Sequence, residues 1–147
     1  MARGGADEKD GQGEREEGAM IIDLALPAPP SELSPNSRLQ WWERNPIKRM
    51  YQDAVLVDVL NAKRAYEVEG AVFPLVEPVT MTVTFLLPDK RHRDWDNLIA
   101  AFKAGQDTIV RAGIISGDSI SVIERVSYEW AYGAAGVLVR IEAGLPL

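Results

Sequence analysis

The segment Arg91-His92-Arg93-Asp94-Trp95-Asp96-Asn97 combines basic side chains with two carboxylates that are one residue apart. It follows a strand-like pattern and precedes a helix-like one, so alternate side chains in it can converge on one point. Hard divalent cations such as Mg²⁺ take oxygen ligands of this kind. Asp94 and Asp96 are therefore candidate metal ligands. Asp and Asn are also common at helix starts, where they cap backbone N–H groups and complement the helix dipole. Spacing alone leaves both roles open.

Length and residue usage limit the kinds of protein this chain can be. It has 147 residues, no cysteine and a single histidine, His92. We expect one domain of ordinary size, without disulfides and without a zinc site, because zinc usually takes several Cys or His ligands. No segment approaches the roughly 18 apolar residues of a membrane span, and the N-terminus lacks the apolar part of a signal peptide. The expected location is cytoplasmic, with no membrane partner.

The net charge of −6 is unevenly distributed along the chain. Residues 1–18 hold six acidic and three basic residues, are rich in glycine and contain no aromatic or β-branched residue. We predict that they form a disordered acidic tail ahead of a domain at residues 19–147. In that domain the basic residues cluster, as Arg44, Lys48 and Arg49 and again as Lys90, Arg91 and Arg93. Such clusters are compatible with phosphate binding, although scattered solvated side chains would look similar.

Hydrophobic patterning predicts an α+β fold, a single domain with a mixed β-sheet of about four strands and two main helices. Strands are expected at residues 21–26, 79–87, about 120–130 and 136–142, the last two joined as a hairpin near Tyr132-Gly133. Residues 27–40 should form a surface loop with a turn at Ser34-Pro35-Asn36. Composition does not distinguish a plain connector from a loop that lies against a ligand.

The first helix is predicted at about residues 46–65, because Asn45-Pro46 is a typical helix start. Trp41 and Trp42, just before it, are expected to be core or staple residues rather than platforms for stacking bases.

The second helix is predicted from an apolar stripe that packs on the sheet. The stripe consists of Leu98, Phe102, Gly105, Ile109 and Ala112, and Gly113 is expected to end the helix in a left-handed conformation. Asp96, Lys103, Asp107 and Arg111 follow the opposite side, where Lys103–Asp107 and Asp107–Arg111 ion pairs are the simplest interpretation. Asp118 follows this helix, either as an ordinary turn residue or as a third carboxylate beside Asp94 and Asp96.

In their order along the chain, these features resemble the RusA family of Holliday junction resolvases. The resemblance extends over residues 20 to 142 or so, and its parts are Pro29-Pro30-Ser31 with Asn36, Arg93-Asp94-Trp95-Asp96-Asn97-Leu98, Lys103, Asp107, Ala112-Gly113 and Asp118. It implies a RusA-like fold and a homodimeric endonuclease that cuts four-way DNA junctions. The implied cofactor is Mg²⁺, with Mn²⁺ as a candidate substitute.

The resemblance also implies roles for individual residues. Asp94, Asp96 and Asp118 would be the catalytic, metal-binding aspartates, and Lys103 and Arg93 would be the basic residues near the scissile phosphate. Contacts to the DNA backbone are expected from the basic clusters, namely Lys90, Arg91, Arg93, Arg44 and Lys48.

Two alternative functions remain. One is a non-catalytic module of the same fold that binds branched DNA, which metal-dependent turnover would exclude. The other is a nucleotide-sugar transferase that uses Asp-x-Asp with Mn²⁺, which binding of a nucleoside diphosphate sugar but not DNA would favour.

Overall fold

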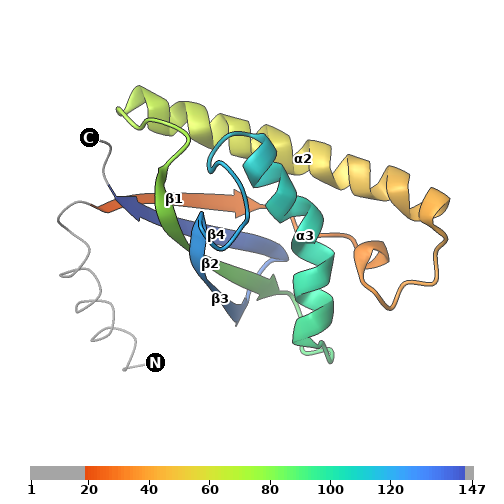
Figure 1. The fold of residues 1–147 in the computed structure, drawn as a ribbon. Helices are drawn as coiled ribbons and strands as arrows, with labels where there is room; N and C mark the ends of the chain where they lie inside the picture. Colours follow the sequence, from red (N-terminus) through yellow and green to blue (C-terminus); the bar gives the residue numbers. More distant parts are fainter. Residues whose placement is uncertain (1–18, 145–147) are drawn as a thin grey trace, which may run out of the picture.

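The computed structural model describes residues 19–144, which form a four-stranded mixed sheet with two long helices on one face (Figure 1). The elements, in chain order, are β1 (Ala19–Leu26), the short 3₁₀ helix η1 (Ser31–Leu33), α2 (Trp41–Val68), β2 (Val76–Leu87), α3 (Trp95–Arg111), β3 (Ile123–Tyr132) and β4 (Gly136–Gly144). The predicted α+β, single-domain arrangement is confirmed. The predicted tail at residues 1–18 lies outside the described residues. No helix within residues 19–144 has the length and apolarity needed to cross a membrane.

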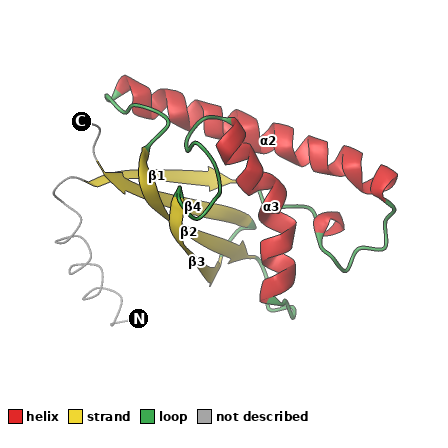
Figure 2. Ribbon diagram, in the orientation of Figure 1, coloured by secondary structure: helices red, strands yellow, loops and turns green. Residues whose placement is uncertain are grey.

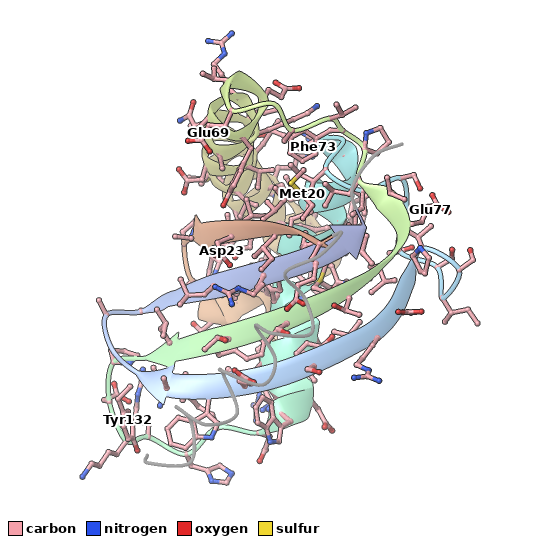
Figure 3. All side chains as sticks on the ribbon, turned by 90° about the vertical axis from the view of Figure 1, so that its left-hand side faces the viewer. Met20, Asp23, Glu69, Phe73, Glu77 and Tyr132 are labelled. Carbon is pink, nitrogen blue, oxygen red and sulfur yellow. The ribbon has the colours of Figure 1, made fainter. Side chains whose placement is uncertain are left out.

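The strand order is β1-β4-β2-β3, which Figure 3 shows from top to bottom. β4 pairs antiparallel with both β1 and β2, whereas β3 pairs parallel with β2. The predicted β3–β4 hairpin is therefore wrong. The chain instead passes over the end of β2, where Gly133 N–H donates to the Leu87 carbonyl at 2.9 Å. Alternate side chains of β4, namely Val137, Val139 and Ile141, are buried. β4 lies between β1 and β2, so the face that carries these side chains is in the middle of the core.

The core lies between the sheet and the two helices (Figure 2). Because strand side chains alternate between faces, one face of β1, β2 and β4 supplies the sheet's largest share of the buried residues. They are Ile22, Leu24, Leu26, Val79, Met81, Val83, Phe85, Val137, Val139, Ile141 and Ala143. Each fully buried side chain of this size contributes about 1.5–3 kcal/mol of hydrophobic stabilisation.

The opposite face of the sheet is polar and faces the viewer in Figure 3. On it, the Asp23 carboxylate accepts two hydrogen bonds from Arg140, at 2.8 Å and 3.0 Å, across the β1–β4 pair. Both side chains are about half exposed, so this pair adds little to stability.

The α2 helix begins at Trp41 and not at Asn45-Pro46 as predicted. Gln40 and Glu43 form a capping box, in which the Gln40 backbone N–H donates to Glu43 Oε1 at 2.9 Å. This box caps the helix five residues earlier than the predicted Asn45 cap would, and Pro46 is accommodated inside the helix. Trp41 and Trp42 are 72% and 58% exposed, so the prediction that they are core or staple residues is wrong.

The α3 helix follows its predicted stripe closely. Phe102, Gly105 and Ile109 are buried against the rest of the core. A Cβ at Gly105 would lie 2.5 Å from Phe102 Cε1, so glycine is the residue that fits beside this ring. Gly113 has a φ of 85°, as predicted for the left-handed end of the helix.

Candidate functional site

Asp94 occupies the N-cap position of α3 but does not use its carboxylate as a cap. Its backbone carbonyl accepts the Leu98 N–H at 3.1 Å, whereas its side chain makes no capping hydrogen bond to any described residue. Asp94 Oδ1 lies 3.0 Å from His92 Nε2 instead, and both side chains are largely exposed. Asp96 is exposed in the first turn of the helix, where its charge complements the dipole. The carboxylate of Asp94 is thus turned outward, where it is accessible to a ligand.

Lys103 joins two carboxylates from different parts of the chain. Its Nζ donates to Asp107 Oδ1, one turn further along α3, and to Asp118 Oδ2 in the segment that follows the helix, at 2.9 Å each. These hydrogen bonds raise the pKa of Lys103, that to Asp107 contributing most. The hydrogen bond from Lys103 lowers the pKa of Asp118. We call Lys103, Asp107 and Asp118 the lysine cluster. The predicted Lys103–Asp107 pair is confirmed, whereas no pair between Asp107 and Arg111 occurs among the described residues.

The three aspartates expected to bind metal are not gathered into one group. Within residues 19–144, no three Asp, Glu, His or Cys side chains form an assembly that could hold a metal ion. Asp118 contacts Lys103 and Asp94 contacts His92. Their role as Mg²⁺ ligands therefore stays a prediction.

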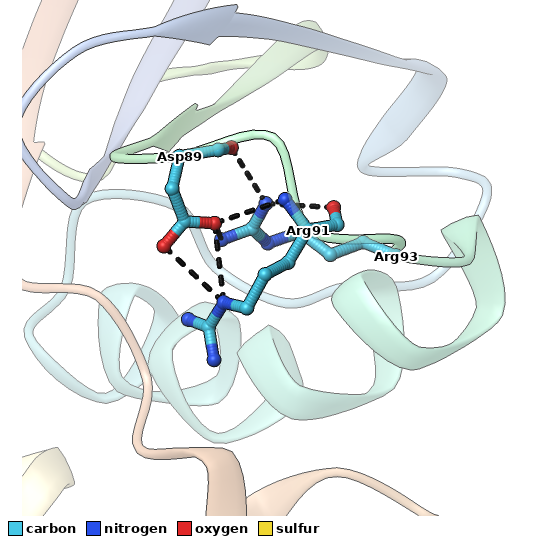
Figure 4. Close-up of polar contacts among 3 residues, drawn as sticks. All are labelled: Asp89, Arg91 and Arg93. Atoms are coloured by element: carbon cyan, nitrogen blue, oxygen red, sulfur yellow. Dashed lines mark hydrogen bonds and ion pairs between the residues drawn. The ribbon is translucent and has the colours of Figure 1, made fainter.

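The loop between β2 and α3 is organised by Asp89 (Figure 4). Arg91 Nε lies 3.1 Å and 3.2 Å from the two oxygens of the Asp89 carboxylate, and the Arg91 backbone N–H also donates to it. Arg93 donates to Asp89 Oδ1 at 2.8 Å and to the carbonyls of Asp89 and Arg91 at 2.9 Å and 3.0 Å. Backbone and side-chain hydrogen bonds from Arg91 contribute most to lowering the pKa of Asp89 to about 2. We call Asp89, Arg91 and Arg93 the arginine loop.

The two arginines of this loop differ in accessibility. The Arg93 side chain is 18% exposed and its guanidinium is bonded inside the loop, whereas that of Arg91 is 78% exposed. The terminal nitrogens of Arg91 have no partner among the described residues. Arg91 is therefore the arginine with donors free for a ligand, and Arg93 holds the loop in shape.

The loop after β1 lies against the start of α3 and encloses a pocket of about 450 Å³ with it. The pocket lining includes Pro29, Pro30, Ser31, Ser34, Asn36, Arg91, His92, Arg93, Asp94, Asn97 and Leu98. Two α2 side chains anchor the loop: Tyr51 donates to the Pro27 carbonyl at 2.7 Å and Arg44 to the Ser37 carbonyl at 3.2 Å. The predicted turn is present, since Ser37 N–H donates to the Ser34 carbonyl at 3.0 Å. The loop is thus a pocket wall and not only a connector.

The remaining basic candidates lie on two elements. Lys90 is exposed in the β2–α3 loop, and Lys48 is exposed on α2. Arg44 is partly buried, and its Nε has no hydrogen-bond partner within the described residues. Because Arg44 holds the loop after β1, its predicted contact with DNA is less direct than that of Lys48 or Lys90.

Sequence reasoning missed three aromatic residues near the arginine loop. Trp95, Trp130 and Tyr132 line a second pocket, of about 250 Å³. The period-two spacing of Trp130 and Tyr132 predicts a shared strand face, but it gives no sign that helices leave that face uncovered.

No family model matches the chain. An uncharacterized protein of Xylella fastidiosa (strain Temecula1) is 30% identical over 89 residues, which cover 60% of this chain and 56% of that protein. The matched part thus spans little more than half the length of the relative. The comparisons attach no activity to the chain.

Proposed function

We propose that this protein is a Mg²⁺-dependent, structure-specific endodeoxyribonuclease that cuts four-way DNA junctions, and that it acts as a RusA-like homodimer. The observation that carries the proposal is the contact between Lys103 and Asp118, which are 15 residues apart in the chain and 2.9 Å apart between Nζ and Oδ2. The resemblance to the RusA family implies an active role for both.

The first pocket provides further support. The Pro29-Pro30-Ser31 segment, Asn36 and the start of α3 are distant in the sequence, yet they line the same pocket. The family resemblance rests on the same segments. Because these segments line one pocket, a single ligand bound there would contact all of them, which would explain why they occur together.

The donor chemistry of the three aspartates fits a hard divalent cation. Asp94, Asp96 and Asp118 are exposed carboxylates, and oxygen donors are what Mg²⁺ prefers. Mg²⁺ sites commonly use one or two carboxylates together with substrate phosphates, so a preassembled group of three is not required. When bound, the ion would supply an activated water and stabilise negative charge on the phosphate.

The basic side chains would act directly on the DNA. Lys103 carries a positive charge at neutral pH, as any lysine of ordinary pKa does, and Asp107 and Asp118 raise its pKa further. Its charge beside Asp118 would neutralise the scissile phosphate. Arg91 would donate from its free terminal nitrogens to a backbone phosphate. Lys90 and Lys48, both exposed, would add salt-sensitive contacts that are independent of sequence.

Cleavage of a labelled synthetic four-way junction tests this function. The assay compares reactions with and without Mg²⁺, a linear duplex of the same sequence, and the Asp96→Asn variant. We expect paired nicks on opposing strands of the junction that require the metal and Asp96. Asp58→Asn is the matched control, because Asp58 is an exposed aspartate on α2, away from both pockets, and should cleave normally. Undiminished cleavage by Asp96→Asn would refute the assignment.

A second candidate is the non-catalytic module that binds branched DNA, because the exposed Lys48, Lys90 and Arg91 would bind backbone phosphates equally well without turnover. Tight junction binding that is unchanged in chelator and in Asp96→Asn, with no cleavage in Mg²⁺ or Mn²⁺, would support this alternative over the nuclease.

A further inference from the structure

The second pocket, of about 250 Å³, combines aromatic rings with positive charge. It is lined by Leu87, Asp89, Arg91, Arg93, Trp95, Leu98, Trp130 and Tyr132. It shares both arginines with the first pocket but none of the predicted catalytic residues, namely Asp94, Asp96, Lys103 and Asp118. Its aromatic side chains have no role in the function proposed above.

The position of β3 at the sheet edge explains why these rings are exposed. Trp130 is paired in register with Phe85, and Tyr132 with Leu87, so both rings stand on the side of the sheet that carries the helices. The helices do not cover the outer part of this edge strand. Trp130 is 50% exposed and Tyr132 is 55% exposed, and no further strand pairs with β3 among residues 19–144. Adjacent exposed aromatic rings of this size mark a site for a partner more often than a feature of the fold.

The arrangement of the two rings leaves stacking surface available. Their centroids are 5.1 Å apart and their planes meet at 80°, a T-shaped pair. The edge of one ring meets the face of the other in such a pair, so the rings do not stack on each other, and with each side chain about half exposed, part of their surface is accessible to a planar ligand.

The charge around the pocket specifies the kind of planar ligand. Arg91 and Arg93 line it with a single carboxylate, Asp89, and the exposed Lys90 lies next to them in the chain. Arg91 keeps its terminal nitrogens free among the described residues, on a side chain that is 78% exposed. A flat aromatic surface beside available guanidinium donors matches a nucleotide, with its base on the rings and its phosphate on the arginine. Bases in an intact duplex are stacked on one another, so only an unpaired nucleotide can make both contacts.

We infer that Trp130 and Tyr132 stack an unpaired base of the DNA while Arg91 binds the adjoining phosphate. The inference rests on the proposed function for the identity of the ligand. It adds a preference that the nuclease proposal does not contain, for DNA with unpaired nucleotides at or beside the branch point.

Fluorescence anisotropy of a short labelled oligothymidylate, in chelator so that no cleavage occurs, tests this inference. We expect the wild-type protein to bind the single strand and Trp130→Ala to bind it roughly 5- to 100-fold more weakly, the usual effect of losing one stacking ring. Trp130→Phe keeps a ring and should restore most of the affinity. Trp41→Ala is the matched control, since Trp41 is exposed but lies outside both pockets.

Intrinsic fluorescence provides a second readout that does not depend on the alanine variant folding. With Trp41 and Trp42 both changed to Phe and tryptophan excited selectively, the emission comes from Trp95 and Trp130, which both line the pocket. Oligothymidylate should quench this emission. Unchanged emission at saturating oligonucleotide would overturn the inference.

The remaining outcomes separate this inference from the proposed function. If the wild type cleaves junctions while Trp130→Ala binds oligothymidylate as tightly as the wild type, the stacking site is refuted and the nuclease stands. If the wild type binds no DNA of any form, both are refuted. If Trp130→Ala turns a dimer into a monomer in sedimentation, the rings form an interface between two copies of this chain, which also overturns the inference.

Discussion

Lys103 and Arg93 are the two basic residues that the RusA resemblance implicates at the scissile phosphate, yet their surroundings differ. The Lys103 side chain is 56% exposed, and its Nζ lies 2.9 Å from carboxylates on two separate segments. The Arg93 side chain is 18% exposed, and all its hydrogen bonds remain within the arginine loop. Lys103 is therefore accessible to a ligand, beside an aspartate with a proposed catalytic role. Arg93 instead stabilises the local fold of its loop.

The difference teaches that a basic residue near a candidate site can serve the fold or the ligand, according to its partners. Lys103 contacts Asp118, for which we propose a catalytic role, whereas Arg93 contacts Asp89, for which no such role is proposed. Arg91, next to Arg93, has the accessible guanidinium. The phosphate contact first assigned to Arg93 is therefore better assigned to Arg91, with Arg93 as a positioning residue.

The largest expected effect is on catalysis at Lys103. Lys103→Met should lower the cleavage rate of a four-way junction by about 10²- to 10³-fold, the usual loss when one group that stabilises developing charge is removed. Its free energy of unfolding should change by less than about 1 kcal/mol, because the ion pairs are exposed. Single-turnover cleavage and urea denaturation measure the two quantities. A variant that is unstable but fully active would reverse the comparison.

Arg93→Ala should show the opposite pattern, with stability as its main effect. Removing a mostly buried guanidinium with three hydrogen bonds should lower the free energy of unfolding by about 1–3 kcal/mol. Arg91→Ala is the matched variant and should cost less than about 1 kcal/mol, since its ion pair is exposed. Chemical denaturation distinguishes them. Equal losses for the two arginines would show that Arg93 has no special structural role.

Arg91→Ala should instead change DNA binding. Losing one phosphate contact should weaken junction binding several-fold and reduce the slope of log affinity against log salt by about 1. Titrations at several salt concentrations measure this slope. The slope for Arg93→Ala should stay at the wild-type value, and a larger decrease there than for Arg91→Ala would assign the phosphate contact to Arg93 after all.

The smallest effect concerns the ionisation of Asp89. Its pKa of about 2 is below the ordinary 3.8, so its contribution to stability is present above pH 4 or so and is lost as the pH falls through about 2. Carboxyl NMR titration measures this pKa directly. It should rise toward 3.8 in Arg91→Ala, because the Arg91 side chain is among the main causes of the shift. A wild-type value near 3.8 would mean that the arginine loop is not held as described.

The α3 region could be predicted from sequence because its signals are local. The apolar stripe, the glycine at Gly113 and the i,i+4 pairing of Lys103 with Asp107 depend on residues a few positions apart, and all three are confirmed. The second contact of Lys103, with Asp118, is not predicted by the sequence, because it joins residues 15 positions apart on different segments.

Features that depend on distant partners could not be predicted in this way. The short connection after Tyr132 favours a hairpin between β3 and β4. In the structure β2 lies between them, because β3 pairs with one edge of β2 and β4 with the other. The sequence also gives no sign that Arg93 would turn back onto its own loop, or that Trp41 would remain exposed. Side-chain directions and exposure of this kind follow from tertiary packing, which local patterns do not contain. The early start of α2, by contrast, follows a local signal, the capping box of Gln40 and Glu43, that the Asn-Pro signal obscured.

A double-mutant cycle on Lys103 and Asp118 tests the central claim most directly. Single-turnover cleavage of a four-way junction in Mg²⁺ would be measured for the wild type, Lys103→Met, Asp118→Asn and the double variant. If the two residues form one catalytic unit, each single variant should be slower by about 10²-fold or more, and the double variant should be no slower than the worse single variant. Cleavage at the wild-type rate by either single variant, or losses that multiply in the double variant, would contradict the claim.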